Sequence, residues 1–178
     1  ALITTPLDQA MLAALADLVA EATASFQAYD YARALERTET FLWRFCDDYV
    51  ELVKGRAYES QGEVLAQSAR AALQLALSTL LRLLAPFMPF VTEEVWSWWQ
   101  EGSVHQAAWP DADELLIRAG DGQPIVLEVA GEVLAEVHRA KTEAKRSLRT
   151  EVRRVEARLT HDRLVALAQQ LERRDQTG

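Results

Sequence analysis

Apolar residues recur at alternating steps of three and four along most of this chain, which is the spacing of a helix that buries one side. The clearest row lies within residues 31–54. Its positions are Leu35, Thr38, Leu42, Phe45, Tyr49 and Leu52. Similar rows occupy residues 6–27, 62–84 and 124–148. The pattern predicts an all-α protein, with long helices packed as a helical bundle over residues 1–149.

Residues at the ends of these rows are typical of helix boundaries. Thr5 and Pro6 suit the cap and the first position of the first helix, and Asp30 suits the cap of the second. Gly55 is expected to end the second helix. Residues 60–63 match a capping box for the third.

The string LLAPFMPFVTEEVW, residues 83–96, interrupts the third row with two prolines. Proline removes a backbone donor, so Pro86 is expected to end the third helix. Thr92 is a good cap for a short helix that runs to about Gln100. The apolar side of that helix comprises Val95, Trp96 and Trp99. We expect a buried corner between two helices here, followed by a loop over residues 102–123.

The pattern changes beyond Thr150. Residues 154–159 alternate between charged and apolar side chains at the period of a strand, a pattern that an irregular extended piece would fit equally well. Leu164, Leu167 and Leu171 then predict a final helix. Residues 150–178 are therefore expected to form a short C-terminal extension, a strand-like piece followed by a helix.

Composition limits the class of protein. The chain has 178 residues, of which 49% are hydrophobic, enough for one sizeable core. No apolar run approaches the ~18 residues of a membrane span, and no leader pattern is present, so we expect a cytoplasmic protein without membrane contact. Cys46 is the only cysteine, which excludes internal disulfides, and its position among apolar residues predicts a buried thiol. Because the sequence lacks an initiator methionine, we expect it to be part of a longer protein.

Charge is distributed unevenly along the chain. The net charge is −8, which disfavours nucleic acid as a partner. Residues 139–158, however, contain eight basic and three acidic side chains, which gives +5 locally and −13 elsewhere. One end of the molecule is therefore basic.

The sequence contains no arrangement typical of catalysis or metal binding. His105, His138 and His161 are far apart and form no ligand pattern, and there is no phosphate-binding loop. The adjacent acidic pairs at residues 47–48 and 93–94 diverge by about 100° on a helix, so the two carboxylates of a pair cannot act on one atom. We predict no catalytic residue, no metal and no cofactor for this chain.

Two groups of basic residues are candidate binding sites. Arg33, Arg37 and Arg44 share one side of the second helix, which ends in Lys54 and Arg56. Such a row is also typical of a solvated face that pairs with neighbouring glutamates. The second group is denser. Because like charges this close repel one another unless an anion offsets them, this group favours contact with nucleic acid. It comprises Arg139, Lys141, Lys145, Arg146 and Arg149.

Several strings resemble one family. The string at residues 83–96 is similar to the corner of the anticodon-binding domain in class I synthetases for valine, isoleucine and leucine. Residues 41–54, FLWRFCDDYVELVK, resemble the matching helix of the valyl-tRNA synthetases. Ala108-Trp109-Pro110 and Arg139-Ala140-Lys141 also fit. The resemblance covers roughly residues 5–150.

The chain departs from the valyl pattern in two places. Asp48 stands where valyl enzymes commonly have tryptophan, and residues 54–58 look closer to the isoleucyl pattern. Conversely, many isoleucyl enzymes carry a cysteine-ligated zinc near the C-terminus, and this chain has no cysteine after Cys46. The isoleucyl family therefore remains the alternative. The long coiled-coil arm of many valyl enzymes is not evident after Thr150, so the arm is either short or truncated.

The resemblance implies a function. It implies that this chain binds valine-accepting tRNA, while ATP and valine react in a catalytic domain upstream in the same polypeptide. We expect the two basic groups to hold the RNA backbone, and Tyr49, Glu51 and Lys54 to contact anticodon bases, although Tyr49 also suits the core. A non-catalytic helical module that binds another protein is the alternative outside this family.

Overall fold

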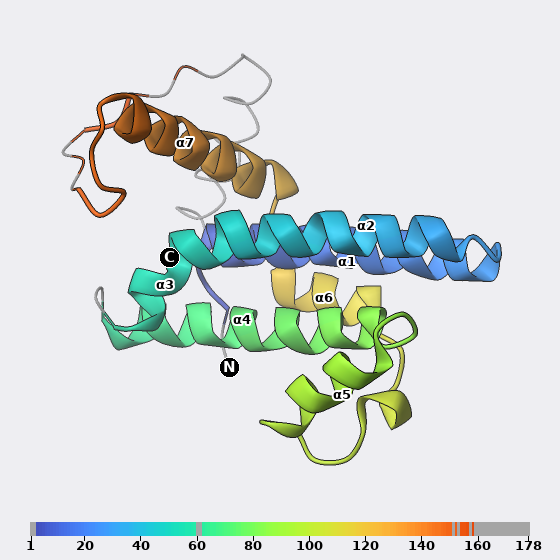
Figure 1. Ribbon diagram of the computed structural model, residues 1–178. Helices are drawn as coiled ribbons and strands as arrows, with labels where there is room; N and C mark the ends of the chain where they lie inside the picture. The colour runs from blue at the N-terminus through green and yellow to red at the C-terminus, as the bar shows by residue number, and fades with distance from the viewer. Residues whose placement is uncertain (1–2, 60–61, 151, 153, 157, 159–178) are drawn as a thin grey trace.

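The structure is a computed structural model that describes residues 3–59, 62–150, 152, 154–156 and 158. Within these residues it contains helices and no strand, so the predicted all-α fold is confirmed (Figure 1). The helices are α1 (Pro6–Gln27), α2 (Tyr31–Arg44), a π turn η1 (Phe45–Tyr49), α3 (Val50–Ala57), α4 (Glu63–Leu84), α5 (Pro89–Ser97), a short 3-10 turn η2 (Val104–Gln106), α6 (Ala112–Ala119) and α7 (Pro124–Glu143).

Helix α1 lies at the centre of the bundle and packs against α2, α4, α6 and α7. Met11, Leu12 and Leu15 are fully buried, because apolar residues cover most of the circumference of this helix. Helix α4 runs alongside and is long and apolar enough to cross a membrane by composition alone. Its buried alanines instead pack in the bundle core, where they allow close contact between helices.

The second helix differs from the prediction in its length and in its register. It continues through Gly55 to Ala57 as α2, η1 and α3. The buried row already departs from the prediction before the π turn, at Ala34 instead of Leu35, and after Tyr49 it continues at Val53 instead of Leu52. Cys46 is exposed, so the prediction of a buried thiol was wrong.

The predicted caps are partly confirmed. The Asp30 side chain accepts a hydrogen bond from the Arg33 backbone at 3.1 Å and caps α2. Thr5 occupies the cap position of α1, but its hydroxyl accepts a hydrogen bond from Arg56 at 3.0 Å and does not cap the helix. Helix α4 begins at Glu63 after Gly62, and Ser60 of the predicted capping box lies outside the described residues.

The proline corner ends α4 as predicted, but α5 begins earlier than expected. Pro89 is its first residue, and the Thr92 hydroxyl donates to the Met88 carbonyl at 2.8 Å from inside the first turn, so Thr92 is not a cap. Trp96 is buried in a small separate cluster with Leu81, Ala85 and Val104. The outer side of the corner is exposed, so it is buried on one side only.

The segment predicted as a loop contains η2 and α6. The Asp111 side chain accepts a hydrogen bond from the Asp113 backbone at 2.9 Å and caps α6. Leu115 and Ala119 of this helix are buried in the main core, where α6 packs on α1. Burial of these two residues outweighs the loop-like composition around them.

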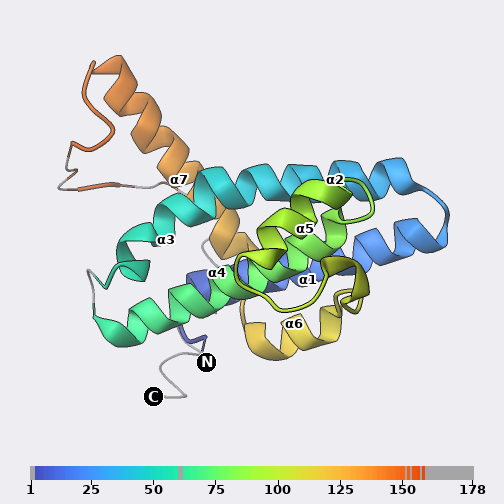
Figure 2. The same cartoon turned by 60° about the horizontal axis from the view of Figure 1, so that its bottom comes forward.

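The helix predicted over residues 124–148 is shorter in the structure. Helix α7 ends at Glu143, and Lys145 has a φ of 50°, a left-handed conformation that redirects the chain. The first half of α7 packs on α1 and η1, and its second half projects from the bundle (Figure 2). Residues 154–156 have no regular secondary structure, as the alternative of an irregular extended piece predicted, and the helix predicted from Leu164 lies outside the described residues.

Gly131 marks the point where α7 crosses η1. A Cβ added to Gly131 would lie 2.7 Å from a carboxylate oxygen of Asp48, closer than unbonded atoms approach. A glycine in the middle of a helix lowers helix stability, and here it permits the close approach. The absence of a side chain at Gly131 therefore allows α7 to pack this closely against η1.

A buried carboxylate connects three parts of the bundle. Asp8 on α1 is fully buried and accepts hydrogen bonds from Arg56 on α3 at 2.7 and 3.1 Å, from the Tyr49 hydroxyl at 2.8 Å and from the Ser68 hydroxyl on α4 at 2.7 Å. Burial alone would raise the pKa of Asp8, but hydrogen bonds from Arg56 and the neighbouring hydroxyls outweigh it and lower the pKa below its ordinary value. The same burial, with the Asp8 charge, raises the pKa of Tyr49.

We predict that Asp8→Asn lowers the free energy of unfolding by roughly 3–5 kcal/mol at neutral pH, because it leaves the Arg56 guanidinium buried without its charge partner. Urea unfolding followed by circular dichroism measures this change. The matched control is Asp17→Asn on the exposed side of α1, which should change the unfolding free energy by less than about 0.5 kcal/mol.

The effect of Asp8→Asn should depend on pH. Since folding lowers the pKa of Asp8, the stabilisation by its carboxylate is complete above the unfolded-state pKa of about 3.9 and is lost as the pH falls through the folded-state pKa. The difference in unfolding free energy between wild type and Asp8→Asn should therefore narrow as the pH falls below about 4. If the difference in unfolding free energy stayed the same as the pH fell, the lowered pKa of Asp8 would be contradicted.

The two tryptophans of α5 and its flank provide a test of the corner. Trp96→Ala should cost about 3–5 kcal/mol of stability, because the ring is buried. Trp98→Ala removes an exposed ring and should cost much less. Pro86→Ala should also cost less than Trp96→Ala, since it mainly frees the unfolded chain. If Trp96→Ala had the same melting temperature as the other two variants, burial of the Trp96 ring would not be needed to hold α5 on the bundle.

Candidate nucleic-acid interface

In the basic row on α2, Arg33 and Arg37 are exposed and Arg44 is half-buried, and two of the three, Arg37 and Arg44, pair with carboxylates. Arg33 lies in the first turn and Arg37 one turn later, beside a shallow depression that Asp30 and Glu36 also line. The Arg37 Nε atom lies 3.5 Å from a carboxylate oxygen of Glu21 on α1. The two arginines therefore offer positive charge to a ligand, partly offset by acidic neighbours.

Arg44 lies in a groove between α2 and α7. Its Nε atom is 4.0 Å from an oxygen of Asp48, and the facing wall of the groove is formed by α7 around Gly131. The groove encloses about 450 Å³ and also contains Glu128 and Glu132. Arg44 is thus surrounded by carboxylates, which makes it a weaker candidate for phosphate binding than Arg33.

Two predicted contact residues lie in the core. Tyr49 has no exposed surface and donates its hydroxyl hydrogen to Asp8, so the alternative of a core role holds. Arg56 is nearly buried and forms the ion pair with Asp8. Glu51 and Lys54 lie on α3, where they pair with each other at 2.6 Å and remain partly exposed. Of these four residues, only Glu51 and Lys54 are placed to contact a base.

The dense basic group is divided between a helix and the turn that follows it. Arg139 lies on α7 and pairs with Glu136 and Glu143. Lys141 donates to the Leu148 carbonyl at 2.7 Å and holds the turn against the helix. Lys145, Arg146 and Arg149 lie beyond the helix end, all exposed, and among the described residues none of them pairs with a carboxylate. The positive charge of these three side chains is therefore not offset by a described carboxylate, which makes them the strongest candidates for binding phosphates.

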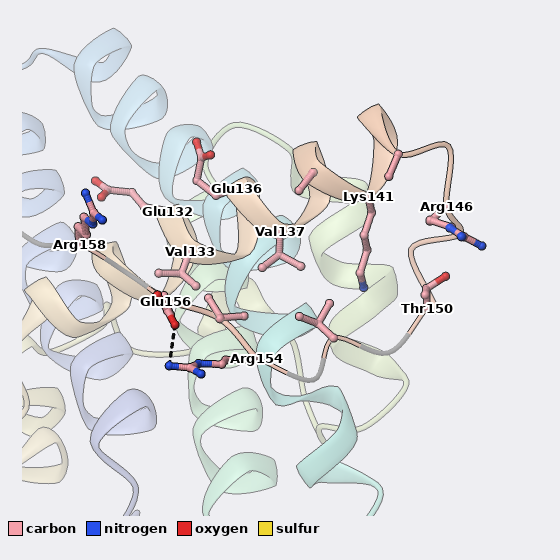
Figure 3. A pocket seen from close by; sticks show the side chains of 14 residues that line it. Glu132, Val133, Glu136, Val137, Lys141, Arg146, Thr150, Arg154, Glu156 and Arg158 are labelled. Carbon is pink, nitrogen blue, oxygen red and sulfur yellow. Dashed lines mark ion pairs between the residues drawn. The ribbon is translucent and has the colours of Figure 1, made fainter.

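A groove of about 660 Å³ separates α7 from the segment that folds back beneath it (Figure 3). Its walls are largely apolar, and four basic side chains surround them. The apolar lining includes Val133, Val137, Ala140, Val152 and Val155, and the basic residues are Lys141, Arg146, Arg154 and Arg158. An apolar wall beside cations suits an unstacked base together with its phosphate.

The sequence analysis did not predict that Arg154 and Arg158 line the groove beside α7. Both were counted in the basic run, but the alternating pattern around them was interpreted only as a strand-like or irregular extended piece, and neither was proposed as a binding residue. In the structure they line the groove with Glu132, Glu136 and Glu156, and Arg154 pairs with Glu156 at 2.6 Å. These carboxylates limit the net charge inside the groove, so Lys145 and Arg149 on the turn are expected to add to the attraction for phosphates.

Residues 8–157 match the family described as the anticodon-binding domain of tRNA ligase. The chain belongs to this family. It is 57% identical over 174 residues to the valine–tRNA ligase of Thermobifida fusca, an alignment that covers 93% of this chain and 20% of the relative. The valine–tRNA ligase of Salinispora arenicola is 52% identical over 181 residues, covering 93% and 21%. That of Leifsonia xyli is 55% identical over 152 residues, covering 84% and 17%.

These similarities confirm the resemblance inferred from the strings at residues 41–54 and 83–96. This anticodon-binding domain spans about a fifth of the length of the curated relatives it matches. The relatives carry the name of the valine enzyme in each of these cases, which favours the valyl over the isoleucyl resemblance despite Asp48 and residues 54–58.

Proposed function

We propose that this chain is the part of a valine–tRNA ligase that binds the anticodon stem and loop of valine-accepting tRNA. The observation that carries the proposal is that the family match covers the helical bundle together with its exposed basic end. ATP-dependent attachment of valine would take place in a catalytic domain elsewhere in the same cytoplasmic polypeptide. This chain would position the tRNA and would not itself react.

The contacts are divided by chemistry. Arginine and lysine on the turn after α7 would hold phosphates, since cations that lack an acidic partner gain most from an anionic ligand. Arg33 on α2 would add a further phosphate contact, with Arg37, Arg44 and Arg139 contributing less because each of them pairs with a carboxylate. Glu51 and Lys54 are the candidates for base edges, because their polar atoms reach solvent on α3.

We predict that Arg146→Glu weakens binding of valine tRNA by the 178-residue chain and lowers its salt dependence. Each lost phosphate contact should reduce the slope of log affinity against log salt by about 0.7–0.9. The matched control is Arg118→Glu, an identical charge change at an exposed position of α6. Equal effects of the two substitutions would show that net charge alone governs binding, and would contradict an interface at the turn after α7.

A kinetic test places the contact in the whole reaction. Arg139→Glu combined with Lys145→Glu in the full-length ligase should raise the KM for tRNA much more than the KM for valine, because neither side chain belongs to the amino-acid site. Proportional changes in both constants would contradict the proposal. Charging assays with valine tRNA and isoleucine tRNA, run side by side, decide between the two amino acids.

A further inference from the structure

Helix α5 has an apolar outer face. Phe90 is 89% exposed, Trp98 is 69% exposed and Val91 is 53% exposed. Phe90 and Val91 are adjacent, and Trp98 follows them by about two helical turns. All three side chains therefore lie on one side of the helix, around Glu94. Met88 extends the face at the start of the helix. Exposed aromatic and aliphatic side chains gathered in this way are typical of a surface that another molecule covers.

The face is held in place by the opposite side of the same helix. Trp96 and Val95 pack into the small core cluster with Leu81 of α4. The Glu93 carboxylate accepts hydrogen bonds from the Ser103 hydroxyl at 2.9 Å and from the Val104 backbone at 3.0 Å, which ties α5 to η2. The Trp98 indole donates to Glu94 at 3.2 Å and is thereby oriented on the surface. A partner would therefore meet a preformed surface, which reduces the entropy lost on binding.

Charge favours a protein over RNA as the occupant. Residues 86–117 contain six acidic side chains and neither lysine nor arginine. Phosphates would be repelled from this stretch, whereas large apolar anchors at a surface poor in cations suit a protein interface. Figure 1 shows α5 beneath α4, on the side of the bundle away from the basic end of α7. The RNA contacts proposed at the end of α7 therefore leave the face free.

We infer that the outer face of α5, formed by Met88, Phe90, Val91 and Trp98, docks on another part of the same ligase polypeptide, outside these 178 residues. The inference rests on the proposed function. The relatives are about five times as long as the matched region, so such a ligase contains ample further surface to cover this face. A second copy of the chain is the competing occupant.

Cysteine labelling tests the inference. In a Cys46→Ser background, Phe90→Cys is compared with Val64→Cys, an exposed position in the first turn of α4. Both thiols should react rapidly with a maleimide reagent in the 178-residue chain. In the full-length polypeptide that contains this chain, the Phe90→Cys thiol should react more slowly by about tenfold or more, since burial removes the thiolate from solvent. The Val64→Cys thiol should keep its rate.

Three results would overturn the inference. Equal labelling of the Phe90→Cys thiol in the short and full-length proteins would show that no other part of the ligase covers it. Concentration-dependent dimers of the 178-residue chain that Phe90→Ser abolishes would identify a second copy as the occupant. Loss of tRNA binding by a folded Phe90→Ser chain would assign the face to RNA. Failure of the proposed function is a separate outcome, because it appears as absent tRNA binding by the wild-type chain.

Discussion

The buried ion pair between Asp8 and Arg56 is the interaction on which the arrangement of the bundle depends. It lies where α1, α3 and α4 meet, and hydrogen bonds from Tyr49 and Ser68 complete it. A buried pair contributes little net stability compared with apolar packing, but either charge left alone would be strongly destabilising. Alternative packings that separate the two groups are therefore disfavoured, and one relative placement of the three helices is selected.

That placement determines where the two proposed contact surfaces lie. The π turn before α3 brings Tyr49 to Asp8 and presents Asp48 to Gly131, so α7 crosses the bundle at this point and its basic end projects. Helix α4 extends from the same ion pair to the proline corner and carries α5 at its far end. One framework thus separates a cationic surface suited to phosphates from an apolar surface suited to protein.

The helices, the end of α4 at the corner and the cap at Asp30 could be predicted because each is encoded by neighbouring residues. Other features depend on residues distant in sequence. Tyr49 and Arg56 looked like binding residues because the sequence shows their polar groups but does not show that Asp8, far away along the chain, pairs with both. Helix α6 was missed because contact with α1 stabilises a short, loop-like segment. The groove beside α7 required the turn at Lys145, which no local signal specified.

Hydrogen exchange of the 178-residue chain, measured with and without valine tRNA, tests most directly whether the two surfaces are separate. We expect tRNA to slow exchange in the second half of α7 and in the turn after it, and to leave exchange in α5 unchanged. Slower exchange in α5 with no change at the end of α7 would contradict this assignment of the two surfaces, because RNA would then occupy the apolar face and the basic end would have no ligand.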